Sequence, residues 1–105
     1  IMYITEAAAA TVQLAEAPLQ QIRTVNYIVD GAKPTPSAGE LADAVRARIP
    51  GAEIDFKPDP EIQPLLDGVI RPLDDSRARE EWDWRPTHDL AAMIDAFLAT
   101  LQERF

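Results

Sequence analysis

The sequence has no cysteine, one histidine and two serines among its 105 residues. Without cysteine, neither disulfide bonds nor thiolate metal sites can form, and a lone histidine, His88, cannot anchor a transition metal. Ser37 and Ser76 both stand where helices are expected to begin, which makes neither a good candidate nucleophile. These scarcities argue against metal catalysis and nucleophilic catalysis by this chain.

Glycine and clustered basic residues are also scarce. The four glycines, at positions 31, 39, 51 and 68, lie too far apart to form a dinucleotide loop or a phosphate-binding loop. Ten Lys and Arg are scattered among 18 Asp and Glu, and the resulting net charge of -8 repels a nucleic-acid backbone. No apolar run approaches the roughly 18 residues of a membrane span, and the first residues do not predict a signal peptide. We therefore expect a cytoplasmic protein without a nucleic-acid partner, a membrane partner or a cofactor site of its own.

The residues that are present predict helices alternating with strands. An Ala-rich helix is expected over residues 4–17, with an apolar stripe and with Thr5 as its cap. The stripe comprises Ile4, Ala8, Val12 and Ala15. Residues 24–29 are β-branched and aromatic and predict a strand that is apolar on both faces, as in a covered sheet.

The middle of the chain predicts a second helix and a second strand. Ser37 and Glu40 have the spacing of a capping box, so a helix should follow Ser37 and end at Pro50-Gly51. The alternating residues 53–57 predict a half-buried strand. Three prolines then predict a stretch of about a dozen residues without regular structure, and loops of that length in compact domains are often functional.

The C-terminal part predicts two helices. A short helix should begin at Asp74-Asp75-Ser76 and carry Trp82, and a longer one should begin near Asp89. We interpret Trp82 and Trp84 as core residues. The predicted fold class is thus α/β, with about four helices and two to three strands, too few strands for a self-sufficient doubly wound sheet.

Residues 59–72 hold the best candidates for a binding site. This segment carries Gln63, Asp67 and Arg71, and an arginine in such a loop could bind a carboxylate or phosphate with two hydrogen bonds. The acidic pairs Asp74-Asp75 and Glu80-Glu81 are better explained as helix carboxylates than as catalytic acids. The candidate site residues are therefore substrate-binding, and no catalytic residue is predicted.

Several motifs together resemble a known family. They are Met2 to Ala7 opening an Ala-rich helix, Asn26-Tyr27 in a strand, the run Leu73 to Arg79, the run Trp82 to Pro86, and Asp89-Leu90. This pattern resembles the C-terminal part of extended short-chain dehydrogenases, and residues 74–93 resemble short-chain L-threonine 3-dehydrogenases most. Gln63 and Asp67 match positions in that family, whereas its neighbouring arginine and tryptophan are replaced here.

The resemblance implies that residues 1–105 are the substrate-side region of an NAD-dependent dehydrogenase or epimerase. It implies the last elements of a Rossmann domain plus a small substrate-binding subdomain, inactive alone, acting on a small-molecule substrate together with a cofactor-binding part that this chain lacks. Neither Tyr3 nor Tyr27 has the lysine four positions later that the family's catalytic tyrosine requires. The alternative is a free-standing acidic α/β interaction module without activity.

The expected apolar surfaces also predict self-association. The helix over residues 4–17 and both faces of the strand over residues 24–29 would need a covering sheet that the chain does not encode. Unpaired apolar strands and large exposed apolar patches tend to associate. We therefore expect the isolated chain to form a dimer or a larger oligomer through these N-terminal elements.

Overall fold

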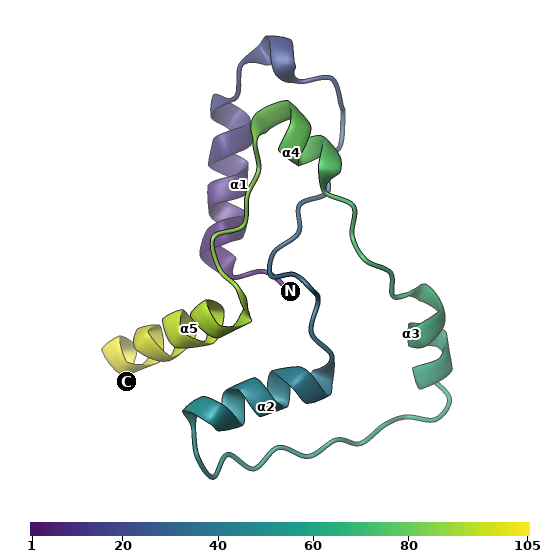
Figure 1. Ribbon diagram of the computed structural model, residues 1–105, viewed down its shortest axis with the longest axis vertical. Helices are drawn as coiled ribbons and strands as arrows, with labels where there is room; N and C mark the ends of the chain where they lie inside the picture. The colour runs from purple at the N-terminus through teal and green to yellow at the C-terminus, as the bar shows by residue number, and fades with distance from the viewer.

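The computed structural model describes all residues from 1 to 105, and its regular secondary structure consists only of helices joined by loops (Figure 1). Its elements are α1 (Ile4–Glu16), the short 3-10 helix η1 (Leu19–Gln21), α2 (Ala38–Arg48), α3 (Gln63–Val69), α4 (Ser76–Trp82) and α5 (Leu90–Arg104). There is no strand and no sheet. The prediction of an α/β fold with two to three strands is therefore wrong for this chain.

The two predicted strands fail because neither finds a partner. A strand is defined by hydrogen bonds to a neighbouring strand, and an isolated extended segment leaves its backbone groups to water. Within residues 24–29, only the amide of Thr24 has a partner, and that partner is a pair of side chains, Glu81 and Tyr27. Residues 53–57 are likewise extended without a ladder.

Helix α2 begins as the sequence predicts. The Ser37 hydroxyl accepts a hydrogen bond from the amide of Glu40 at 3.2 Å, and the Glu40 carboxylate accepts one from the amide of Ser37 at 2.8 Å. Beyond the end of α2, Gly51 has φ 87°, a conformation that residues with a Cβ rarely adopt. The predicted capping box and helix end are confirmed.

Helix α1 has the predicted span but buries a different face. Its capping residue is Tyr3, which makes no side-chain cap hydrogen bond, so the prediction that Thr5 caps it is wrong. Ile4, at the head of the predicted stripe, is 76% exposed. The side that is packed consists of Glu6, Ala10, Leu14 and Ala17, with the first two fully buried. The packed residues have the same spacing as the predicted stripe but lie two positions later in the sequence, so the predicted stripe faces solvent.

The core lies where α1, α4 and the segment after α4 meet. It consists of Ala10, Ala78, Trp82 and Trp84, with Tyr27 packed edge-on against the Trp82 ring at 5.7 Å between centroids. The Trp84 indole N–H donates a hydrogen bond to the carbonyl oxygen of Asp30 at 3.0 Å. Both tryptophans are core residues, as predicted.

Helix α4 ends in a left-handed residue. Asp83, which follows Trp82, has φ 57° and ψ 36°. A residue with a Cβ is strained in this conformation, and aspartate tolerates it better than most.

Substitutions at Asp83 should follow from this backbone conformation. We expect Asp83→Gly to be neutral or mildly stabilising and Asp83→Val to cost more than about 1 kcal/mol of unfolding free energy. Urea denaturation followed by circular dichroism measures both. Equal stability of the valine variant and the parent would show that the left-handed geometry is absent in solution.

The chain is flat and unusually open for its size. It measures 51 × 40 × 19 Å, with a radius of gyration of 16.9 Å, against about 13 Å for a compact domain of this length. Its accessible surface is 8083 Å², against about 5,800 Å² for a compact monomer of 11.6 kDa. Only 13 of 105 residues are buried. The fold is thus not a self-contained globule, and none of its helices is long and apolar enough to cross a membrane.

Candidate functional site

The predicted substrate-binding residues lie on and beside α3. The segment was expected to be irregular, but it contains a two-turn helix, so that part of the prediction is wrong. Pro64 sits in the first turn, where a missing backbone N–H costs no helical hydrogen bond. The Asp59 carboxylate accepts hydrogen bonds from the amides of Glu61 and Ile62, which starts the turn. Proline therefore shortens helical structure here but does not abolish it.

Gln63, Asp67 and Arg71 are brought together by α3. The Gln63 amide donates to the Asp67 carboxylate at 2.8 Å, one helical turn away. The Arg71 guanidinium donates to the carbonyl oxygens of Ile70 at 2.8 Å and Asp67 at 3.4 Å, closing the end of the helix. All three side chains are exposed, and none lines the three principal cavities. They form a polar strip on a helix that nothing else in the chain covers.

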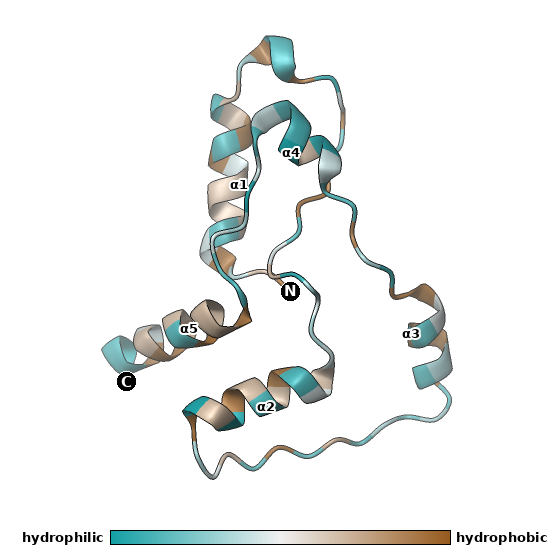
Figure 2. Cartoon of the chain, viewed as in Figure 1, coloured by the Kyte–Doolittle hydropathy of each residue, from teal (hydrophilic) through white to brown (hydrophobic).

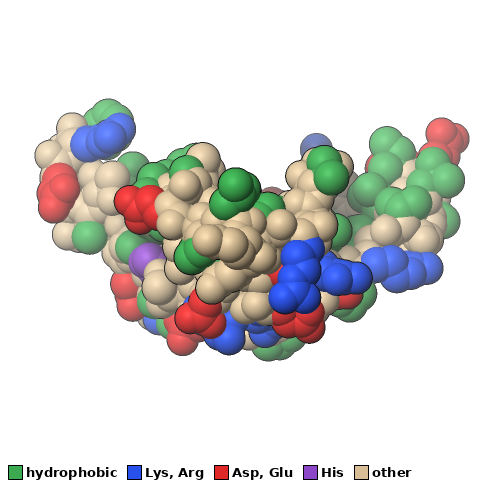
Figure 3. Space-filling model, turned by 90° about the horizontal axis from the view of Figure 1, so that it is seen from above, with side chains coloured by type: hydrophobic (Ala, Val, Ile, Leu, Met, Phe, Trp, Pro, Cys, Tyr) green, Lys and Arg blue, Asp and Glu red, His purple; other side chains and the backbone are tan.

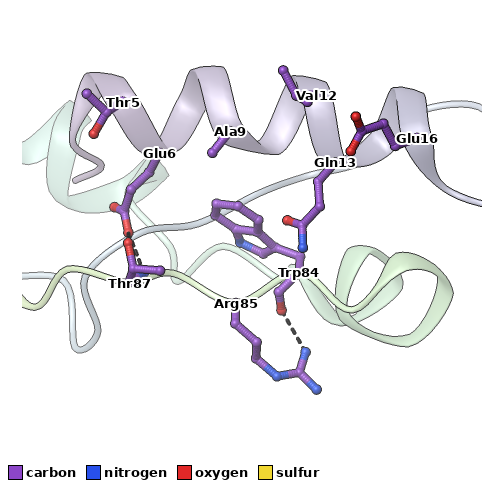
Figure 4. A pocket seen from close by; sticks show the side chains of 9 residues that line it. All are labelled: Thr5, Glu6, Ala9, Val12, Gln13, Glu16, Trp84, Arg85 and Thr87. Atoms are coloured by element: carbon purple, nitrogen blue, oxygen red, sulfur yellow. Dashed lines mark hydrogen bonds between the residues drawn. The ribbon is translucent and has the colours of Figure 1, made fainter.

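The largest of these hollows runs along α1. It has a volume of about 610 Å³ and lies between α1 and the segment that leads from α4 to α5 (Figure 4). Glu6, Ala9 and Gln13 point from α1 toward Trp84 and Thr87 across it. The full lining is Thr5, Glu6, Ala9, Val12, Gln13, Glu16, Trp84, Arg85 and Thr87. This groove contains one buried carboxylate, that of Glu6.

Glu6 fixes the chain where it enters α5. One of its carboxylate oxygens accepts hydrogen bonds from the amides of Thr87 at 2.5 Å and His88 at 2.9 Å, and from the Thr87 hydroxyl at 3.2 Å. Burial acts to raise the pKa of the Glu6 carboxyl, but the hydrogen bonds from His88 and Thr87 outweigh it and hold this pKa below its usual value. A carboxylate committed to these bonds positions the backbone and is a poor general acid.

Glu81 of α4 organises a second polar cluster. Its carboxylate accepts hydrogen bonds from the Arg23 amide at 2.7 Å, the Thr24 amide at 3.2 Å, the Thr24 hydroxyl at 2.7 Å and the Tyr27 hydroxyl. The side-chain hydrogen bonds from Tyr27 and Thr24 lower the Glu81 pKa to about 2. Glu81 therefore tethers residues 23–27 to α4.

Asp75 forms a third cluster at the start of α4. Its carboxylate, 1% exposed, pairs with Lys33 at 2.9 Å and Arg79 at 2.6 Å. Burial favours a raised pKa for Asp75, but the hydrogen bonds from Lys33 and Arg79 prevail and lower it. The neighbouring Asp74 accepts from the Ser76 amide at 3.0 Å, so this acidic pair belongs to the helix start, as interpreted from the sequence.

The buried carboxylates of the three clusters form no recognisable catalytic constellation. Each buried carboxylate that has a lowered pKa, on Glu6, Asp75 and Glu81, is held ionised by hydrogen bonds to other parts of the chain. General acid-base catalysis needs a group whose pKa lies near the working pH. Sequence reasoning missed the roles of Glu6 and Glu81, because their partners lie 81 and 58 residues away in Thr87 and Arg23.

Comparison with known proteins identifies the relatives. No protein-family model matches the chain. The mitochondrial L-threonine 3-dehydrogenase of Bos taurus is 31% identical over 98 residues, which cover 93% of this chain and 26% of that protein. An uncharacterized epimerase/dehydratase of Staphylococcus haemolyticus is 29% identical over 105 residues, covering 99% of this chain and 32% of that protein.

Solved structures give the same result. The GalE-like L-threonine dehydrogenase from Cupriavidus necator, in its holo form, has a TM-score of 0.82 at 33% identity, covering 95% of this chain and 32% of that one. The L-threonine dehydrogenase from Phytophthora infestans has a TM-score of 0.84 at 26% identity, covering 99% of this chain and 33% of that one.

The homologues of the chain are therefore dehydrogenases and epimerase/dehydratase proteins. Its structural neighbours are short-chain L-threonine dehydrogenases, which confirms the resemblance inferred from the sequence motifs. The chain spans roughly a quarter to a third of the length of the relatives it matches.

Proposed function

We propose that the chain is the substrate-side region of an NAD-dependent oxidoreductase, similar to L-threonine 3-dehydrogenase or to a sugar-nucleotide epimerase/dehydratase, and that it is inactive alone. The observation that carries this proposal is the structural match to threonine dehydrogenases over 95% to 99% of the chain and about a third of theirs.

The NAD site belongs to the part of the enzyme outside this chain. A dinucleotide is bound by a glycine-rich turn at a free helix N-terminus. Here the start of α2 is occupied by Ser37 and Glu40, and that of α5 by Asp89, which accepts from the Ala92 amide at 2.8 Å. Gly31 offers no cradle either, because a Cβ there would lie 2.3 Å from the Ile1 carbonyl oxygen. The starts of α2 and α5 and the surroundings of Gly31 therefore do not fit the cofactor.

The polar strip of α3 is the proposed contribution to substrate binding. Gln63 and Asp67 present an amide and a carboxylate on adjacent turns, and Arg71 keeps guanidinium N–H groups free beyond those that bond Ile70 and Asp67. A free guanidinium edge can bind a carboxylate, as in an amino acid, or a phosphate, as in a sugar nucleotide. The substrate class of the enzyme therefore contains an anionic group.

The rival, a free-standing acidic interaction module, needs a core that stabilises it without further protein. The accessible surface exceeds that of a compact monomer by about 2,200 Å², more than a standard interface buries on one partner. This excess accessible surface favours a region of a larger enzyme, in which more protein covers the surface, over a free-standing module.

A chimera tests the proposal. The corresponding C-terminal third of the Cupriavidus necator enzyme would be replaced by this chain, and NADH formation from L-threonine would be followed by absorbance. We expect an active chimera in which Arg71→Ala raises KM about tenfold or more, whereas Arg77→Ala on α4 changes KM less than twofold.

The isolated chain serves as the second arm of the experiment. It should form no NADH, and millimolar NAD should leave its melting temperature unchanged, whereas a binder at 100 times its Kd gains about 2.7 kcal/mol. A saturable shift would contradict the proposal. The proposal would also be contradicted by a chimera that folds and binds NAD but neither oxidises L-threonine nor epimerises a sugar nucleotide.

A further inference from the structure

The groove along α1 has an acidic residue at each end and an apolar stretch between them. Glu6 lies at one end, Glu16 lies at the other, and Ala9 and Val12 line the middle. Because these positions recur every three or four residues, they share one side of the helix. In Figure 2, hydrophilic and apolar bands alternate along α1. The two glutamates are ten residues apart, which corresponds to about 15 Å along the helix axis.

The buried carboxylate at the Glu6 end has an unused acceptor. Its Oε1 atom accepts all the hydrogen bonds from Thr87 and His88, whereas Oε2 is buried and has no partner. A buried carboxylate oxygen without a donor is unfavourable. Figure 4 shows the Glu6 side chain reaching from α1 across the groove toward Thr87. A positively charged donor at this end of the groove would therefore be stabilised by the negative charge of Glu6.

The one basic residue that lines the groove is turned away from it. The Arg85 guanidinium pairs with Asp83 at 3.0 Å and donates a hydrogen bond to the Trp84 carbonyl oxygen at 2.6 Å. Figure 4 shows this guanidinium pointing away from α1. Glu16 forms no ion pair with any residue of the chain. The groove thus keeps two acidic ends, and no group of three acidic or imidazole side chains converges there to hold a metal ion.

We propose that the groove along α1 binds a linear polyamine, an aliphatic chain with an ammonium group at each end. One ammonium group lies at the Glu6 end and the other at Glu16, and each supplies N–H donors to a carboxylate. The methylene chain between them covers Ala9 and Val12, so apolar surface is removed from water on both sides. The volume of about 610 Å³ is in the range of small-molecule sites. The inference is independent of the proposed enzymatic function.

Isothermal titration calorimetry with spermidine tests the proposal. The chain should bind one spermidine in saturable fashion at low salt, and n-hexylamine, which has a single ammonium group, should bind about tenfold more weakly. Glu16→Gln removes one carboxylate and should weaken spermidine binding about fivefold. Ala9→Phe fills the middle of the groove and should abolish it. Glu103→Gln removes the same charge from an exposed position on α5 and should change the Kd less than twofold.

The control variant separates the groove from the general charge of the chain. Acidic side chains are spread over the face seen in Figure 3, and the net charge of -8 attracts any polycation to the whole surface. Circular dichroism verifies that the variants are folded, which the exposed positions of Ala9 and Glu16 favour. Equal weakening by Glu16→Gln and Glu103→Gln, several spermidines per chain, unchanged binding by Ala9→Phe, or no binding at millimolar spermidine would each overturn the proposal.

Discussion

Replacing Trp84 by alanine is expected to leave most of the chain unfolded at 25 °C. Trp84 is 2% exposed and packs against Trp82 in a core that also contains Ala10 and Ala78, so it is one of the two large side chains of a four-residue core. Removing a buried tryptophan costs about 3–5 kcal/mol. Small domains have a total stability of about 5–15 kcal/mol, and a chain that buries so few residues belongs at the low end.

Trp84→Phe tests the contribution of the Trp84 hydrogen bond apart from that of the aromatic ring, and Phe105→Ala serves as a control. Trp84→Phe keeps an aromatic ring but leaves the carbonyl oxygen of Asp30 without its donor, which costs about 1–3 kcal/mol for a buried acceptor. Phe105→Ala removes a fully exposed ring and should change nothing. Far-UV circular dichroism through a urea titration measures all three. Native-like stability of Trp84→Ala would show that the core lies elsewhere.

Helices α2 and α5 could be predicted from the sequence because their signals are local. The capping box of Ser37 and Glu40 and the Asp89 cap each involve residues three positions apart, and both helices begin where these residues predict. The two predicted strands are wrong, because a strand depends on a partner that the pattern of residues 24–29 does not specify. Those residues have strand composition, and the chain supplies no neighbour for them.

The buried side of α1 could not be predicted from hydrophobicity alone. The predicted stripe and the buried one have the same spacing and differ by two residues, and the buried one contains a glutamate. Hydrophobicity alone therefore selects the side that begins at Ile4, while a distant pair of amides, on Thr87 and His88, draws Glu6 into the interior. The apolar side of α1 that begins at Ile4 therefore remains exposed.

The candidate site could also be predicted only in part, because some of its contacts are local and others join distant residues. Gln63, Asp67 and Arg71 were found from a proline-broken segment, and α3 brings them into one strip. Their role in substrate binding stays a prediction. The sequence predicts Glu81, like Glu80, to be an ordinary helix carboxylate. Its hydrogen bond to the amide of Thr24, 57 residues earlier, cannot be inferred from sequence spacing.

The ionised carboxylate of Glu81 should contribute to the stability of the chain at neutral pH. Its pKa is lowered from 4.5 to about 2, chiefly by the hydrogen bonds from Tyr27 and Thr24. A folded-state pKa below the unfolded one means that the stabilisation is present above about pH 4.5 and is lost as the pH falls toward 2. The Glu81→Gln variant has no such charge, so it should be less stable than the parent at pH 7.

The pH dependence distinguishes this carboxylate from its neighbour. The stability difference between the parent and Glu81→Gln should be largest at pH 7 and shrink steadily between pH 4.5 and pH 2, because the parent's carboxylate becomes protonated there. Glu80→Gln changes an exposed carboxylate one position earlier, for which no tether exists, and should run parallel to the parent at every pH. Urea midpoints measured from pH 2 to pH 7 provide the curves. If Glu80→Gln and Glu81→Gln gave the same curve, the effect would come from overall charge, and residues 23–27 would not be tethered to α4 through Glu81.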